Sequence, residues 1–100
     1  MDKQFHSLRV QEVRPETHDT VSLIFEVPQD LREVFRYKQG QYLTLRFGIN
    51  GQDVRRSYSM CSSPLEEHLA VSVKRLAGGL VSNYINDKVQ AGQTIEVMPP

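Results

Sequence analysis

Two short segments contain the residue types needed to bind a phosphorylated aromatic ligand. The first, Arg56-Ser57-Tyr58-Ser59, offers a guanidinium group for phosphate, a flat aromatic ring and a hydroxyl at Ser59. Side chains alternate along a strand, so Arg56 and Tyr58 share one face and could hold a phosphate and a planar ring together. The alternative interpretation is a solvated basic pair, Arg55-Arg56, followed by an ordinary strand aromatic.

The second segment, Gly78-Gly79-Leu80-Val81-Ser82, lies where a helix is expected to begin. Free N–H groups at a helix N-terminus, approached through glycines, bind phosphate oxygens. The alternative is an ordinary helix start with Ser82 in the first turn. Each segment alone favours its plain structural interpretation, but together in one small chain they indicate a nucleotide with an aromatic headgroup.

Other chemistries lack the residues that they need. The sequence contains no GxxxxGK[ST], GxGxxG, HExxH, CxxC or GxSxG motif. His6, His18 and His68 have no metal-ligand spacing, so no metal site is expected, and Ser59 with His68 lacks the glycines of a nucleophile turn. The single cysteine, Cys61, excludes an internal disulfide and a cysteine-ligated iron–sulfur cluster. We expect Cys61 to be a small buried hydrophobe rather than a redox group.

Period-two alternation predicts the strands that must position these segments. Apolar residues recur at every second position over residues 21–27 and 43–49, as is typical of half-buried strands. Asn50-Gly51 follows the second run and predicts a tight type I′ hairpin leading into an antiparallel strand. A helix is expected over residues 80–89 and a short turn over residues 29–35. The expected strands are residues 6–14, 21–27, 43–49, 53–60, 69–74 and a short last strand containing Ile95 and Val97.

These elements predict an all-β fold. The chain has 100 residues, of which 39% are hydrophobic and 24% charged, so one globular domain with a modest core is expected. Hairpin-linked strands with one short helix before the last strand favour a six-stranded antiparallel Greek-key barrel over a sandwich. Closing the sheet into a barrel would remove exposed strand edges.

Charge and hydropathy exclude several classes of partner. The 12 Lys and Arg residues balance 12 Asp and Glu residues, and zero net charge opposes binding to nucleic acid or to an anionic membrane surface. No run approaches the ~20 apolar residues of a membrane span, and the N-terminus lacks the apolar region of a secretion signal. A cytoplasmic location is therefore expected. The sequence stops at Pro99-Pro100, directly after the expected last strand, which favours a fragment of a longer protein.

Four motifs in order resemble the FAD-binding domain of the ferredoxin–NADP reductase superfamily. Arg56-Ser57-Tyr58-Ser59 resembles the RxYS motif of that superfamily, and Gly79-Leu80-Val81-Ser82 resembles the motif that opens the only helix of its barrel. Residues 37–42 resemble the segment before its third strand, with Gln39 where proline is usual. Residues 91–97 resemble the segment leading into its last strand, with Gln93 where aspartate is usual.

The resemblance implies that the domain holds FAD, or less often FMN, and that the flavin performs the redox chemistry. By resemblance, Arg56 should contact the flavin phosphate, Tyr58 should stack on the isoalloxazine ring and Ser59 should lie near its N5 atom. Residues 72–74 should line the ribityl and phosphate region, and residues 79–82 should donate to the pyrophosphate. The expected cofactor-binding residues are Arg56, Ser57, Tyr58, Ser59, Ser72, Val73, Lys74, Gly79, Leu80, Val81 and Ser82.

Residues 73–85 are especially similar to the reductase subunits of phenylacetyl-CoA oxygenases (epoxidases). In such reductases an NAD(P)H-binding domain and a [2Fe–2S] ferredoxin domain follow the flavin domain. Electrons then pass from NAD(P)H through FAD and the cluster to an oxygenase component, here in phenylacetate or other aromatic degradation. Neither further domain is present in this sequence, so the chain alone is not expected to be catalytically complete. The alternatives are a stand-alone flavin or flavodoxin reductase domain, and a flavin-free small β-barrel that binds another partner.

Overall fold

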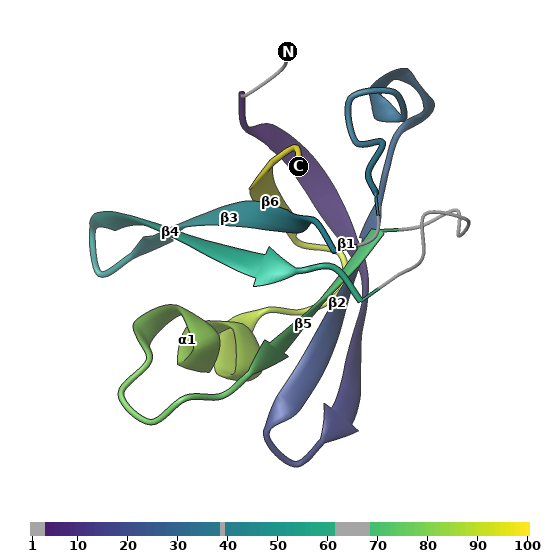
Figure 1. The fold of residues 1–100 in the computed structure, drawn as a ribbon. Helices are drawn as coiled ribbons and strands as arrows, with labels where there is room; N and C mark the ends of the chain where they lie inside the picture. Colours follow the sequence, from purple (N-terminus) through teal and green to yellow (C-terminus); the bar gives the residue numbers. More distant parts are fainter. Residues whose placement is uncertain (1–3, 39, 62–68) are drawn as a thin grey trace.

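A computed structural model describes residues 4–38, 40–61 and 69–100 of the chain. Figure 1 shows that strands dominate this part of the molecule and that one α-helix precedes the last strand. The elements are β1 (His6–Thr17), β2 (Thr20–Glu26), a 3₁₀ turn η1 (Gln29–Leu31), β3 (Tyr42–Ile49), β4 (Gln52–Ser59), β5 (Leu69–Lys74), α1 (Leu80–Lys88) and β6 (Thr94–Met98).

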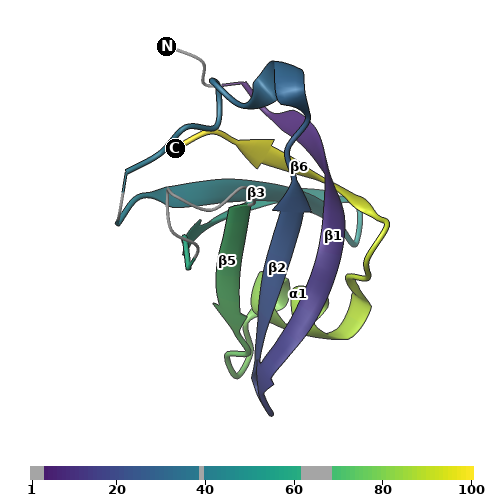
Figure 2. The ribbon, with the colours of Figure 1, turned by 90° about the vertical axis from the view of Figure 1, so that its right-hand side faces the viewer.

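The six strands form one antiparallel sheet in the order β4-β3-β6-β1-β2-β5. Strands β1 and β2 form one hairpin and β3 and β4 another, and the last strand, β6, lies between β1 and β3. Figure 2 shows β1, β2 and β5 side by side, with β3 and β6 crossing them. The predicted all-β fold of six antiparallel strands with one short helix before the last strand is confirmed.

The two outermost strands in this order, β4 and β5, meet at one point. Met60, which follows β4, forms an antiparallel bridge with Val71 of β5. The backbone N–H of Cys61 donates to the carbonyl oxygen of Ala70 over 2.9 Å. Within the residues that the structure describes, this junction joins β4 to β5 in place of the continuous ladder that a fully closed barrel would have.

The β3–β4 hairpin forms as the sequence predicts. Ile49 pairs with Gln52, leaving a two-residue loop in which Asn50 and Gly51 have φ of 53° and 76°. A type I′ turn needs positive φ at both positions, and Asn and Gly are the residues that tolerate it best. The hairpin therefore fixes which residues of β3 lie opposite those of β4.

Three local expectations differ from the structure. Strand β1 extends past residue 14 to Thr17, because an irregular register between Pro15 and Thr17 accommodates the proline. The turn expected over residues 29–35 is a 3₁₀ turn over Gln29–Leu31. Cys61, expected to be buried, is exposed. Alternation along the chain places the preceding Met60 in the core, so the side chain of Cys61 points outward.

One hydrophobic core lies on the inner face of the sheet, and α1 covers part of it. Val81 and Ile85 of α1 are buried, while its Tyr84 ring packs edge-on against Phe47 of β3 with the ring centroids 5.6 Å apart. The helix lies beside β5 (Figure 1). The largest fully buried side chains are Phe25, Phe35, Leu8, Leu23, Leu43, Leu45, Ile85, Val10, Val71, Val73, Val81 and Val97.

Candidate functional site

Arg56 and Tyr58 lie on the same face of β4, as predicted. Arg56 pairs with Leu45 and Tyr58 pairs with Leu43, and both of these leucines are fully buried. Cross-strand partners share one face, so Arg56 and Tyr58 lie on the core-facing side of the sheet. Arg56 is nevertheless exposed and Tyr58 only partly buried. Both side chains are therefore at least partly accessible on this face of β4.

Arg56 differs from its neighbouring arginines in its charge partners. Arg46 and Arg55 both form ion pairs with Asp53, over 3.0 and 3.4 Å. The guanidinium of Arg56 donates to the carbonyl oxygen of Arg55 over 2.7 Å, and within the described part of the chain it has no carboxylate partner. A guanidinium with free donors is suited to bidentate binding of phosphate.

Tyr58 is only partly buried, so part of its side chain is exposed. Its ring packs against the hydrophobic core. Burial raises the pKa of the Tyr58 hydroxyl above its ordinary value, and the positive charge of Arg56 partly opposes that shift. Tyr58 is therefore a neutral, flat, half-buried aromatic side chain next to a cation.

The two serines of this segment lie on the opposite face of β4. The Ser57 hydroxyl lies 3.0 Å from the hydroxyl of Thr44 on β3. Ser59 is exposed and is the last residue of the strand. A planar ring stacked on Tyr58 would therefore have to extend past the end of β4 to contact the Ser59 hydroxyl.

The chain enters α1 through a turn that requires glycine at two positions. Gly78 has a φ of +73°, and a side chain at Gly79 would place its Cβ 2.5 Å from Ser82 Oγ and 3.2 Å from the Leu76 carbonyl oxygen. Gly79 is the N-cap of α1, and no side chain caps the helix. The first amides of an α-helix have no intrahelical acceptor, so those of Leu80 and Val81 remain available to an anion.

Ser82 is occupied within this turn. Its side chain is 5% exposed, and its hydroxyl accepts a hydrogen bond from the Leu76 N–H over 3.2 Å and donates to the Gly79 carbonyl over 3.5 Å. Leu80 is 41% exposed, whereas Val81 is buried. In this geometry the helix offers an anion its backbone N–H groups, and the Ser82 hydroxyl braces the turn.

The three predicted residues of β5 point in different directions. Ser72 and Lys74 are exposed on one face, and Val73 is fully buried on the other. The Val73 carbonyl oxygen accepts a hydrogen bond from the Asn86 side chain of α1 over 3.4 Å. Val73 can therefore contact a ligand only through its backbone.

The junction between β4 and β5 places the end of β4 beside the middle of β5. Continuing the antiparallel register from Met60 and Val71 would set Tyr58 opposite Val73 and Arg56 opposite Arg75. The described strands form no ladder there.

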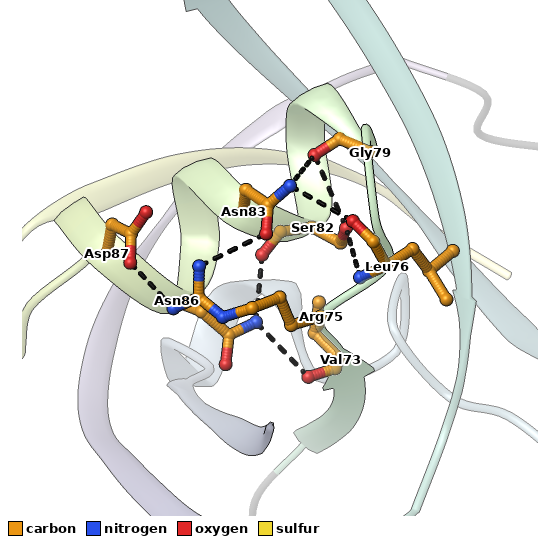
Figure 3. A network of polar contacts seen from close by, with 8 residues as sticks. All are labelled: Val73, Arg75, Leu76, Gly79, Ser82, Asn83, Asn86 and Asp87. Carbon is orange, nitrogen blue, oxygen red and sulfur yellow. Dashed lines mark hydrogen bonds and ion pairs between the residues drawn. The ribbon is translucent and has the colours of Figure 1, made fainter. Parts of the chain in front are cut away.

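Sequence reasoning missed a polar network behind this helix start (Figure 3). Arg75 donates to the side chains of Asn83 and Asp87, over 3.1 and 2.6 Å. The hydrogen bond from Arg75 lowers the pKa of Asp87 below its ordinary value. Asn83 and Asp87 are four residues apart and so share one helix face, and that spacing was the signal available in the sequence.

The described residues contain neither a candidate metal-binding cluster nor a helix that could span a membrane. In residues 4–38, 40–61 and 69–100, no cluster of three or more His, Cys, Asp or Glu side chains could hold a metal ion. His68 and Gln39, which sequence reasoning considered, lie outside those ranges. No helix in the described part of the chain has the length and apolarity of a membrane span.

Comparison with known proteins gives the family. Residues 7–100 match the oxidoreductase FAD-binding domain family. The chain is 45% identical over 96 residues to one of the subunits of 1,2-phenylacetyl-CoA epoxidase from Escherichia coli K12, covering 96% of this chain and 27% of that protein. It is also 45% identical over 95 residues to the ferredoxin reductase component of 3-ketosteroid-9-alpha-monooxygenase from Rhodococcus rhodochrous, covering 93% and 27%.

A solved structure agrees with this result. The FAD/NAD-binding domain of nitric oxide dioxygenase from Vibrio cholerae superposes with a TM-score of 0.79 at 28% identity, over 100% of this chain and 44% of that one. The chain spans about a quarter of the length of the two curated relatives. The expected superfamily resemblance is confirmed, and the chain belongs to the oxidoreductase FAD-binding domain family.

Proposed function

We propose that this chain is the FAD-binding domain of a longer NAD(P)H-dependent reductase that supplies electrons to an oxygenase. The observation that carries the proposal is that Arg56 and Tyr58 share one face of β4 and are at least partly exposed there, while α1 begins at Gly79 with no side-chain cap. This arrangement has what a flavin nucleotide needs: a cation and helix amides for phosphate, and an aromatic face for the ring.

In this proposal each residue has a defined task toward the cofactor. Arg56 binds a phosphate oxygen through guanidinium donors that no described carboxylate occupies. Tyr58 stacks on the isoalloxazine ring, with its own ring held against the core. The amides of residues 80–82 bind the pyrophosphate, while Ser72, Val73 and Lys74 of β5 and the backbone of Ser57 and Ser59 line the rest of the site. Bound FAD converts the two-electron chemistry of NAD(P)H into single-electron transfer.

The proposal also concerns the longer protein to which this chain would belong. The matched relatives include a component of an epoxidase and a monooxygenase ferredoxin reductase component, each several times longer than this chain. We assign NAD(P)H binding and a [2Fe–2S] cluster to parts of the protein outside residues 1–100. The partner is an oxygenase of aromatic or phenylacetate degradation, and the location is the cytoplasm.

Cofactor binding is tested directly by adding FAD to the purified chain. The expected result is flavin absorbance that comigrates with the protein through gel filtration, together with quenching of flavin fluorescence in a titration. The Arg56→Ala variant should bind more weakly than the parent. A chain that stays colourless with excess FAD and releases all flavin on the column would contradict the proposal and favour a flavin-free binding barrel.

The electron partner is tested on the full-length protein. Reduction of a one-electron acceptor that depends on NADH or NADPH, together with the absorbance of an iron–sulfur cluster, would support an oxygenase reductase. Reduction of free flavin or flavodoxin by a protein without a cluster would favour the stand-alone reductase instead.

A further inference from the structure

Asn83 binds both carbonyl oxygens of the turn that leads into α1. Its side-chain NH₂ group donates to the Leu76 carbonyl oxygen over 3.0 Å and to the Gly79 carbonyl oxygen over 2.7 Å (Figure 3). The Gly79 carbonyl oxygen also accepts the first helical hydrogen bond, from the Asn83 N–H, over 3.2 Å. One side chain therefore anchors both ends of the turn to the helix.

The Asn83 carboxamide is itself held in one orientation. Its oxygen accepts a hydrogen bond from a guanidinium nitrogen of Arg75 over 3.1 Å. The other terminal guanidinium nitrogen of Arg75 binds Asp87 over 2.6 Å, and the Arg75 N–H donates to the Asp19 carbonyl over 2.6 Å. Because Arg75 can only donate, the oxygen of Asn83 faces Arg75 and its NH₂ group faces the turn.

The direction of the Gly79 carbonyl decides the direction of the neighbouring amide. The carbonyl of Gly79 and the N–H of Leu80 belong to one planar peptide group and point in opposite directions. When Asn83 holds that carbonyl toward the helix, the Leu80 N–H points away from the helix, toward the open side of the turn. No side chain caps α1, so this amide has no competing acceptor from a capping residue.

We propose that Asn83, held by Arg75 and Asp87, is a positioning residue that aims the first amides of α1 at the flavin phosphate. This inference rests on the proposed function, and it adds residues that make no contact with the cofactor themselves. Without the Asn83 side chain each turn carbonyl loses one donor: the Gly79 carbonyl keeps the Asn83 N–H and the Ser82 hydroxyl, and the Leu76 carbonyl keeps the Gly79 N–H. The peptide group between Gly79 and Leu80 is then held less firmly in the direction that presents its N–H to an anion. A carbonyl oxygen turned toward a phosphate would repel it.

The test compares Asn83→Ala with Asn86→Ala, a matched variant on the same helix. The Asn86 side chain also binds backbone carbonyls, those of Ser82 and Val73, but it does not contact the turn carbonyls. FAD, FMN and riboflavin are titrated into the parent and both variants, with circular dichroism and thermal unfolding as checks on folding. Riboflavin carries the ring without phosphate, so it separates phosphate positioning from general damage to the site.

Asn83→Ala is expected to weaken FMN and FAD binding roughly tenfold and to change riboflavin binding by less than about twofold, since a charged hydrogen bond is misdirected. Asn86→Ala should keep the parent's preference for FMN over riboflavin. In ¹H–¹⁵N spectra, FMN should shift the Leu80 and Val81 amides of the parent and of Asn86→Ala, but not those of Asn83→Ala. Equal losses for all three flavins, or equal behaviour of the two variants, would overturn the positioning role.

Arg75→Lys provides a second route if Asn83→Ala unfolds. Lysine keeps the positive charge, but its single ammonium cannot reproduce the two-nitrogen grip on Asn83 and Asp87. The expected result is the same selective loss of FMN over riboflavin, smaller than that of Asn83→Ala. Parent-like FMN affinity in Arg75→Lys would show that charge, not orientation, matters. A parent chain that binds none of the three flavins would overturn the proposed function, and this inference with it.

Discussion

Two adjacent arginines on β4 allow an experiment to distinguish a specific contact between Arg56 and a phosphate from general attraction by positive charge. Arg56 is exposed on the core-facing side of β4 without a described carboxylate partner, and Arg55 pairs with Asp53 on the other face. Arg56→Ala should weaken FAD binding by roughly 1–3 kcal/mol, the scale of a lost charged hydrogen bond. Isothermal titration of the parent and variant with FAD measures the difference.

Arg55→Ala is the matched control, because it removes the same charge one residue away. Its FAD affinity should stay within about 0.5 kcal/mol of the parent, the usual size of a surface substitution. Equal losses for the two variants would mean that long-range charge attracts the phosphate and that Arg56 has no specific contact.

The half-buried hydroxyl of Tyr58 gives the domain a distinctive response to alkaline pH. Burial raises its native pKa, so the native state holds this proton more tightly than the unfolded chain. The contribution of this hydroxyl to the free energy of unfolding is complete below about pH 10, the pKa of tyrosine in the unfolded chain. It is lost as the pH rises through the higher pKa of the native state. Urea unfolding of the parent and Tyr58→Phe from neutral to alkaline pH should show a steeper alkaline loss for the parent. Parallel pH profiles would refute this assignment.

At the scale of elements, the turn into α1 should be sensitive to one added methyl group. Gly79→Ala would bring a Cβ within 2.5 Å of Ser82 Oγ and close to Leu76. Because hydrogen bonds from Ser82 and Asn83 hold the turn in place, we expect a loss of roughly 1–3 kcal/mol in the free energy of unfolding. Chemical denaturation measures it.

Gly48→Ala on β3 is the control for this change. Gly48 has no positive φ, and a Cβ built there meets no atom within 4 Å. Its stability should stay within about 0.5 kcal/mol of the parent. A Gly79→Ala variant as stable as Gly48→Ala would show that the turn relaxes easily around the methyl group.

Most elements could be predicted from the sequence because each leaves a local signal. Alternation marks strands that bury one face, and Asn50-Gly51 marks the hairpin that sets the register of Arg56 and Tyr58. The end of β1 could not be predicted, because the irregular pairing at Pro15 depends on its partner strand. Local signals thus predict the elements better than their ends.

The residues of the candidate site could be predicted from the sequence, but the directions of their side chains could not. Strand alternation correctly placed Arg56 and Tyr58 on one face. Alternation does not reveal that the Ser82 hydroxyl forms hydrogen bonds with the backbone of the turn before α1, because those bonds depend on the path of residues 76–79. The partners of Asn83 likewise become visible only once the turn is folded over the helix.

At the scale of the whole molecule, the junction of β4 and β5 should be the weakest seam of the sheet. Among the described residues, these strands are joined by one bridge and by the hydrogen bond that the Cys61 N–H donates to Ala70, whereas Leu23 lies in β2 between two paired neighbours. Hydrogen exchange should therefore be faster at the Cys61 amide than at the Leu23 amide.

Added FAD should slow exchange at Cys61, because the proposed cofactor contacts both sides of this seam. Hydrogen exchange followed by NMR, with and without FAD, measures the change. Exchange at Cys61 that is as slow as at Leu23 in the free chain would contradict the weak seam. Exchange at Cys61 that FAD leaves unchanged would place the cofactor elsewhere.

The position of β6 has a consequence for the order in which the chain can fold during synthesis. Strand β6 is the last to leave the ribosome, yet it lies between β1 and β3 and pairs with both. Until residues 94–98 emerge, β1 and β3 both lack the ladders that they form with β6, and among the described residues only the junction of β4 with β5 can link the two hairpins. The central part of the sheet, in which β6 pairs with β1 and β3, therefore forms in a late step of folding.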